Sequence, residues 1–310
     1  MLPADDARSI TEPEVASRES ICLSFRIVIA LKTRITGRAF DEERALYGIT
    51  DAIVSDCRFS GPADGESALK ESSRIDVNGC VFDLRYPLWH VTCGNIASSE
   101  FTGNCRAPMW YDKEISLSDC SIDGVKAFRE CRGVSLKNVR ANSPEFFWKC
   151  RDSVIDDLEL VSEYPFLECE RIHVNDMDMD AKYSFQYCSD IEISDSDFRT
   201  KDAFWHCKDV TVRDSVLKGE YLGWYSENLH LVNCRIEGTQ PFCYCNNLVL
   251  EDCEMIDTDL AFEKSSVRVD VRGRIESIRD PYEGVIEADS IGEVIDDPGV
   301  CRIIIRGTGS

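Results

Sequence analysis

The chain has 310 residues, of which 43% are hydrophobic and 30% are charged, so it is long enough and apolar enough to bury a core. Its formal net charge is −22. A surface this acidic repels a phosphate backbone or an anionic membrane, so we expect neither nucleic acid nor a membrane as partner. A glycan or another protein is compatible with this charge.

The first 36 residues match nothing downstream, and we predict that they form an atypical or mobile N-terminal extension. Their one apolar run, residues 21–31, is short and is interrupted by Arg26. The segment therefore lacks the basic start and the long apolar stretch of a signal peptide or a membrane span. We expect a cytoplasmic protein whose 16 cysteines are mostly reduced thiols.

From about residue 44 the chain repeats itself, first every 21 residues and then every 19. In the 19-residue repeats one column holds cysteine, and the column three places before it holds phenylalanine. The cysteine column is Cys131, Cys150, Cys169, Cys188, Cys207, Ser226 and Cys245. The phenylalanine column is Phe128, Phe147, Phe166, Phe185, Phe204, Gly223 and Phe242.

After each cysteine come two apolar residues in alternation, which is typical of a strand, and then an Asp or Asn, which tolerates a left-handed bend. This third column, which we call the Asx column, is Asp119, Asn138, Asp157, Asp176, Asp195, Asp214, Asn233 and Asp252. Units of this length cannot bury their own apolar face, so they must stack. A further aromatic strand is expected just before each cysteine.

The repeat thus predicts an all-β fold, a single-stranded right-handed parallel β-helix (solenoid) with 19–21-residue coils over residues 37–310. Phe, Cys and aliphatic ladders should lie inside and an Asx ladder at a corner, with degenerate coils and a cap after residue 265. Cysteine packs as a small hydrophobe, and no CxxC pair exists, so neither a metal nor a cofactor is expected. The alternative for the thiols is a cross-link between neighbouring coils.

Several longer segments extend beyond the repeat: "EERALYG" (42–48), "LRYPLWHV" (84–91), "CRAPMWY" (105–111) and "KGEYLGWYSENL" (218–229). The repeats resemble those of pectin-lyase-like right-handed β-helix proteins. These segments resemble, more specifically, an uncharacterised family known as domain of unknown function 3737. The resemblance runs from about residue 37 to the end. It implies a β-helix without an established activity, and it carries no catalytic residues.

All five tryptophans fall in one column, one residue after the phenylalanine column: Trp89, Trp110, Trp148, Trp205 and Trp224. If phenylalanine points inward, this column points outward. Beside it are Tyr111, Tyr187, His206 and Tyr225, and in the turn before it are Tyr183 and Tyr221. Exposed aromatic rings are costly without a partner, so we predict a binding or scaffold module with a groove for an extended carbohydrate-like ligand or a protein. The alternative is that the tryptophans fill a wide corner of the core or lie beneath the N-terminal segment.

The same face carries the candidate catalytic residues Glu163, Lys182, Lys201, Asp202 and Glu220. Asp202 and Glu220, one coil apart, could be the carboxyl pair of a glycoside hydrolase. Lys182 and Lys201 should lower each other's pKa, as the base of a polysaccharide lyase requires. A carbohydrate-active enzyme is therefore the first alternative function. A second is an acidic DNA mimic, which predicts negative charge arranged along one face.

Overall fold

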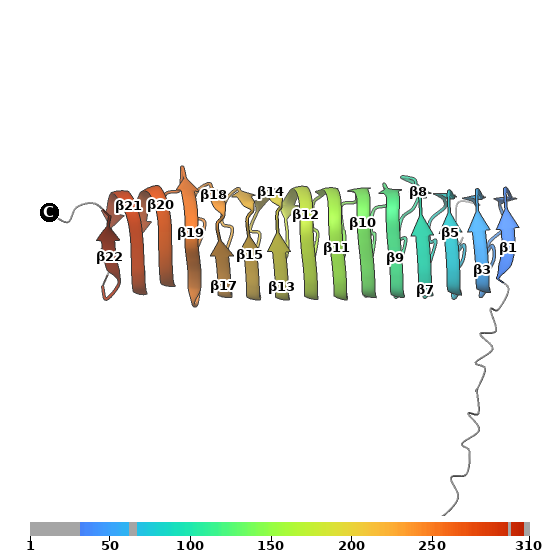
Figure 1. Ribbon diagram of the computed structural model, residues 1–310, viewed down its shortest axis with the longest axis horizontal. Coiled ribbons are helices and arrows are strands. Elements are labelled where there is room, and N and C mark those ends of the chain that lie inside the picture. Colours follow the sequence, from blue (N-terminus) through green and yellow to red (C-terminus); the bar gives the residue numbers. More distant parts are fainter. Residues whose placement is uncertain (1–31, 62–66, 297–298, 307–310) are drawn as a thin grey trace, which may run out of the picture. The chain divides into compact units, whose positions relative to one another are not determined.

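The computed structural model describes residues 32–61, 67–296 and 299–306. Within these residues there is no helix, and 22 strands pair in parallel into one sheet. The sheet winds into a right-handed β-helix of about 14 turns of about 19 residues, whose coils stack from β1 to β22 in Figure 1. The predicted fold is confirmed. No helix of the described residues could cross a membrane.

In chain order the strands are β1 (Thr33–Thr36), β2 (Ala39–Phe40), β3 (Thr50–Ser55), β4 (Arg58–Ser60), β5 (Ser73–Asn78), β6 (Val81–Asp83), β7 (Thr92–Ala97), β8 (Glu100–Phe101), β9 (Lys113–Ile122), β10 (Arg132–Asn142), β11 (Arg151–Ser162), β12 (Glu170–Tyr183), β13 (Ser189–Ser194), β14 (Asp197–Lys201), β15 (Lys208–Arg213), β16 (Val216–Lys218), β17 (Glu227–Val232), β18 (Arg235–Glu237), β19 (Leu248–Ile256), β20 (Ser266–Arg279), β21 (Glu283–Ile295) and β22 (Arg302–Ile305). The first strand starts before the predicted boundary at residue 37. The remainder of the predicted extension, residues 1–31, lies outside the described residues.

The phenylalanine column lies in the interior, as predicted. Its phenylalanines are at most 1% exposed, and the rings of Phe166 and Phe185 stack with centroids 4.5 Å apart. A second ladder, which the sequence analysis did not single out, consists of Phe40, Phe59, Phe82 and Phe101, with centroids 4.8–5.0 Å apart. Burying one such ring stabilises the fold by about 1.5–3 kcal/mol, so these columns hold the coils together.

The cysteine column is also interior, and the fifteen described cysteines are all free thiols. Burial raises the pKa of Cys150 and of Cys188 well above the ordinary thiol value. A buried thiol that stays protonated is a poor nucleophile. These cysteines therefore contribute to packing rather than to reactivity.

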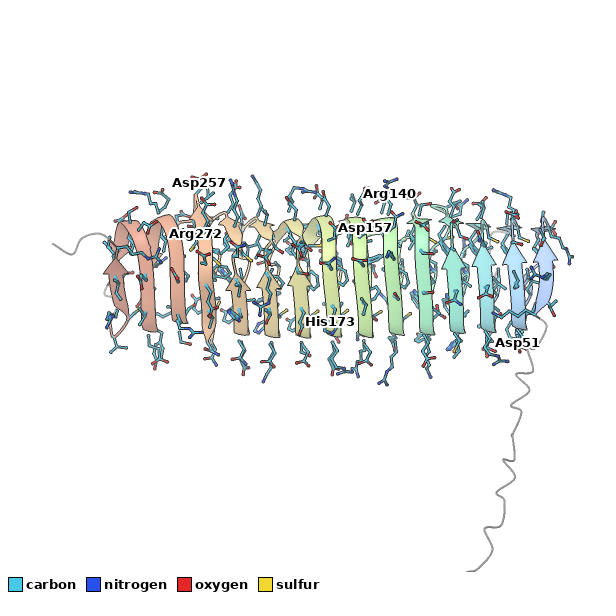
Figure 2. All side chains as sticks on the ribbon, in the orientation of Figure 1. Asp51, Arg140, Asp157, His173, Asp257 and Arg272 are labelled. Atoms are coloured by element: carbon cyan, nitrogen blue, oxygen red, sulfur yellow. The ribbon has the colours of Figure 1, made fainter. Side chains whose placement is uncertain are left out.

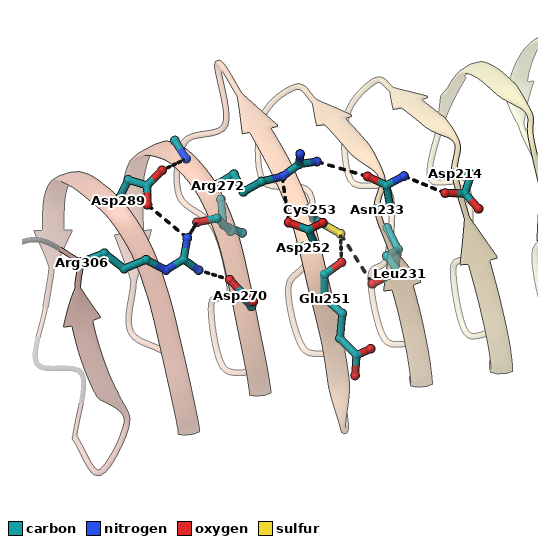
Figure 3. Close-up of polar contacts among 12 residues, drawn as sticks. Asp214, Leu231, Asn233, Glu251, Asp252, Cys253, Asp270, Arg272, Asp289 and Arg306 are labelled. Atoms are coloured by element: carbon teal, nitrogen blue, oxygen red, sulfur yellow. Dashed lines mark hydrogen bonds and ion pairs between the residues drawn. The ribbon is translucent and has the colours of Figure 1, made fainter.

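The Asx column forms the predicted corner. All eight residues have left-handed backbone, with φ between +49° and +60°. Asn side chains bridge neighbouring carboxylates: Asn138 donates to Asp119 at 2.5 Å and Asn233 donates to Asp214 at 2.6 Å. Figure 3 shows how Arg272 extends the second bridge, binding Asn233 at 3.2 Å and Asp252 at 3.0 Å. The amide and guanidinium groups relieve the repulsion between stacked carboxylates.

The predicted aromatic strand before each cysteine is wrong. This segment is a turn in which left-handed residues alternate with ordinary ones, as in Phe147 (φ 62°) and Lys149 (φ 56°) around Trp148. The backbone still bonds to both neighbouring coils, because the Trp148 N–H donates to Phe128 O and the Lys149 N–H donates to Leu167 O. Extended backbone could not turn this narrow corner. Successive side chains in the turn nevertheless point alternately inward and outward, as they would in a strand.

Candidate functional site

The tryptophan column lies on the surface. Each of the five tryptophans is partly exposed, whereas the phenylalanines that precede Trp148 and Trp205 are fully buried. The prediction that the column points outward is therefore confirmed, and the alternative of a wide core corner is excluded.

In the N-terminal half of the column the rings cover one another. Trp89 and Trp110 stack with centroids 5.0 Å apart and an interplanar angle of 6°. The Arg129 guanidinium lies 4.7 Å from the Trp110 ring and 4.7 Å from the Trp148 ring. Tyr111 packs edge-on against Trp89 and Trp110. These predicted site residues form a closed stack, with few ring faces left for a ligand.

Trp205 differs from the other four tryptophans. Trp89, Trp110, Trp148 and Trp224 each donate the indole N–H to a backbone carbonyl of the next coil at 2.5–2.9 Å. No such bond of Trp205 occurs among the described residues, nor does Trp205 stack on Trp224 in the way that Trp89 stacks on Trp110. Among the described residues the Trp205 ring contacts Tyr187 and His206 at tilted angles of 44° and 42°, and the rest of the ring borders an opening.

The opening beside Trp205 is a cavity of about 580 Å³. It arises where two columns carry a smaller residue: Gln186 replaces tryptophan, and Asp202 stands in the column of Tyr183 and Tyr221. The regular pairing of β12 with β14 also shifts between Asp180 and Tyr183, at the edge of this cavity. The aromatic pocket, as we call it, is lined by Tyr164, Tyr183, Gln186, Lys201, Asp202, Trp205, Tyr221, Trp224 and Tyr225.

A ladder of stacked rings leads away from the pocket. Tyr187, His206, Tyr225 and Tyr244 stack in succession, with centroids 5.4, 4.9 and 4.9 Å apart. Tyr187 is 50% exposed and Tyr225 is 43% exposed. The ladder runs across four coils and shares Tyr225 with the pocket.

Two charged groups line the pocket, and only one of them has a charged partner. Lys201 pairs with Glu220 at 3.0 Å, and its ammonium lies 4.9 Å from the Tyr221 ring centroid. Asp202 belongs to none of the ion pairs found among the described residues. Burial raises the pKa of Asp202; Lys201 opposes the shift and Glu220 adds to it.

The catalytic candidates are only partly brought together. The hydrogen bond to Glu220 raises the pKa of Lys201, so the predicted lowering by a neighbouring lysine is wrong for Lys201. Asp202 and Glu220 do lie in adjacent coils, where the Asp202 N–H donates to the Glu220 backbone carbonyl at 3.0 Å. The Glu220 carboxylate is occupied by Lys201, however. Glu163 and Lys182 are exposed and outside the pocket lining.

Other concavities carry more charged and polar side chains than the aromatic pocket. One of about 640 Å³ contains the pair of His173 with Glu192, and another of about 430 Å³ contains the pair of Arg140 with Glu159. Figure 2 shows His173 and Arg140 at opposite ends of the long strands. In the part of the chain that the structure describes, no cluster of His, Cys, Asp or Glu is arranged to hold a metal ion.

Negative charge gathers along part of the Asx corner, where Asp157, Asp176, Asp195 and Asp214 follow one another without an intervening Asn. Elsewhere charges alternate from coil to coil, as in the pairs Lys208–Glu227 and Lys218–Glu237. The run of negative charge along one face that a DNA mimic predicts thus extends over four coils at this corner.

The family model described as "Protein of unknown function (DUF3737)" matches residues 33–303. The chain belongs to this family. Comparison with curated proteins gives no significant match. Among solved structures, this DUF3737 chain is similar to the periplasmic alginate epimerase AlgG, with 10% identity and a TM-score of 0.34 over 83% of this chain and 77% of that one. It is also similar to an endo-xylogalacturonan hydrolase from Aspergillus tubingensis, with 9% identity and a TM-score of 0.27 over 89% of each chain. No residue role is transferred from either enzyme.

In this DUF3737 protein the predicted residues Tyr183, Trp205, Tyr221, Trp224 and Tyr225 meet in one pocket. The sequence analysis missed Tyr164 and Gln186 as pocket residues. Gln186 interrupts the tryptophan column where the cavity forms, but Arg129 and Leu167 interrupt the same column, so the interruption alone does not locate a pocket. Nothing in the sequence indicates that the environment of Trp205 differs, because Trp205 has the regular spacing of its column.

Proposed function

We propose that this protein is a binding module whose ligand, an extended carbohydrate-like chain, occupies the aromatic pocket. Trp205 supports the proposal most: it combines an uncovered ring face with an unbonded indole N–H at the wall of the cavity. A sugar ring presents C–H groups that pack on an aromatic face and hydroxyl groups that accept a hydrogen bond. Ligand pockets in general combine apolar walls with a few placed polar groups.

The ladder of Tyr187, His206, Tyr225 and Tyr244 extends the same surface along the β-helix. Its rings repeat at the coil spacing, so it offers successive contacts to a chain longer than the pocket itself. This supports an extended ligand rather than a single small molecule.

The test is a titration of the protein with soluble oligosaccharides, followed by tryptophan emission and by calorimetry. Trp205→Ala should weaken binding at least tenfold, which corresponds to about 1.4 kcal/mol. The matched control is Trp110→Phe, since Trp110 lies in the closed stack and its replacement should leave affinity unchanged. A panel without saturable binding would overturn the proposal, as would binding that depends on Trp110 and not on Trp205.

The enzyme alternative rests on Asp202. A carboxyl with a raised pKa suits a general acid, whereas Lys201, which is held protonated by Glu220, does not suit a base. Assays for new reducing ends and for unsaturated products on the same panel separate the two functions. Turnover that disappears in Asp202→Asn would make this protein an enzyme rather than a pure binding module.

A further inference from the structure

The aromatic pocket holds one carboxylate that forms no ion pair with the described side chains, although Lys201 partly offsets its charge from a distance. Of its two charged residues, Lys201 is neutralised by Glu220 at 3.0 Å. Asp202 is partly buried and makes no ion pair among the described residues. A desolvated carboxylate without a partner is unfavourable, and a ligand cation that approaches it gains more than it would in open water.

The walls around Asp202 also favour a cation. Tyr183 and Tyr221 lie on either side of it in the same column, and each already has a lysine ammonium near its ring, at 5.2 Å from Lys182 and 4.9 Å from Lys201. Ring faces attract cations through their quadrupole, and this attraction is stronger where water is excluded. Trp205 and Trp224 add two indole rings, the aromatic type that binds cations best.

An anionic ligand would be disfavoured at the same place. A uronate, sulfate or phosphate group would meet the Asp202 carboxylate, and the nearest cation, Lys201, is already paired. The net charge of −22 adds a long-range preference for cationic over anionic ligands, although salt screens it.

We infer that the ligand bears an ammonium group that docks between Asp202 and the surrounding aromatic rings. This inference rests on the proposed carbohydrate-binding function, within which it selects amino sugars with a free amine over neutral or acidic sugars. The sugar ring would pack against Trp205, and the ammonium would become the ion-pair partner of the Asp202 carboxylate.

The experiment compares three sets of oligosaccharides of equal length by calorimetry: glucosamine oligomers, their N-acetylated counterparts, and neutral glucose oligomers. At a pH where the amine is protonated, the glucosamine oligomers should bind at least tenfold more tightly than either other set. Asp202→Asn should remove this preference, so that amine and neutral oligomers bind it with similar affinity, and Asp202→Glu should retain part of it. Thermal unfolding of each variant checks that the fold is intact.

The matched control is Glu192→Gln, which removes the same charge from an exposed side chain in the concavity that contains His173. It should leave the preference for amines in place. Equal affinity for amine and neutral oligomers would overturn the inference while the proposed function stands. A preference that survives Asp202→Asn would also overturn it. Binding of a trimethyllysine peptide but of no oligosaccharide would overturn the carbohydrate function and the selection of amino sugars with it.

Discussion

Asp112 is the one carboxylate that occupies the buried cysteine column in the described chain. It lies 19 residues before Cys131 and is 0% exposed. One carboxyl oxygen accepts the Val91 N–H at 2.7 Å, and the other has no hydrogen-bond partner in the described structure. Burial raises the pKa of Asp112 well above the ordinary carboxyl value, and the neighbouring Cys131 adds to the shift. The folded state therefore favours the protonated form of Asp112 more than the unfolded chain does.

This difference predicts how stability depends on pH. A carboxyl whose pKa is raised on folding favours the folded state below its unfolded pKa, near 3.9, and this advantage is lost as pH rises towards the folded pKa. Asp112→Asn removes the titration, so its stability relative to wild type should increase with pH, by up to about 1.4 kcal/mol per pH unit inside that window. Denaturant titrations at several pH values measure the difference.

Asp112→Cys provides a second variant, because cysteine is the usual residue of this column. It should show the same pH-dependent gain without the unpaired amide group of asparagine. A constant difference from wild type across the pH range, in both variants, would mean that Asp112 is ionised in the folded protein.

At the scale of elements, the turn that carries the tryptophans has two different arrangements along its length. In the N-terminal coils it is a structural stack, with Arg129 between Trp110 and Trp148 and paired with Glu145 at 2.9 Å. In the coils from Tyr164 to Tyr225 the same turn encloses the pocket. The same turn backbone thus carries a packed stack in some coils and a candidate binding surface in others.

Arg129→Gln should therefore lower the free energy of unfolding by about 1–2 kcal/mol, since each of its two ring contacts contributes about 0.5–1 kcal/mol at a partly exposed site. It should also change the emission of the adjacent tryptophans. Arg235→Gln is the control, an exposed arginine in β18 whose loss should cost less than about 0.5 kcal/mol. Equal effects of the two variants would contradict a structural role for the stack.

The elements could be predicted because one residue type recurs in one column. Phenylalanine, cysteine and Asx each had enough repeats to separate interior from corner, and the structure confirms all three. The aromatic turn could not be predicted as a turn, because alternating left-handed backbone gives the same alternation of side chains as a strand. The pocket could not be predicted either, since it depends on how the Trp205 ring is oriented beside two smaller residues, Gln186 and Asp202.

At the scale of the whole β-helix unit, the thiols report on its integrity. Of the fifteen described cysteines only Cys93 is exposed; it donates to Glu114 at 3.2 Å, and this hydrogen bond raises its pKa. The other fourteen are buried in the stacked coils. Their exposure requires that coils separate, so their reactivity measures unfolding of the stack rather than local chemistry.

Iodoacetamide should therefore label Cys93 in the folded protein, faster at higher pH as its thiolate forms, and the fourteen buried cysteines only after denaturation. Peptide mapping by mass spectrometry measures the extent at each site, and Cys93→Ser serves as the control. Labelling of Cys150 or Cys188 at the rate of Cys93 under native conditions would contradict a closed core.

The left-handed residues have a consequence for how such a chain reaches its native state. A single coil contains several of them outside glycine, such as Phe147, Lys149, Asp152 and Asp157. Each costs roughly 1–2 kcal/mol in an isolated peptide, so one coil alone is strongly unfavourable. Hydrogen bonds to a neighbour already in place offset this cost, so assembly resembles growth of a one-dimensional crystal: a rare nucleus of adjacent coils forms, and further coils then add to its two ends.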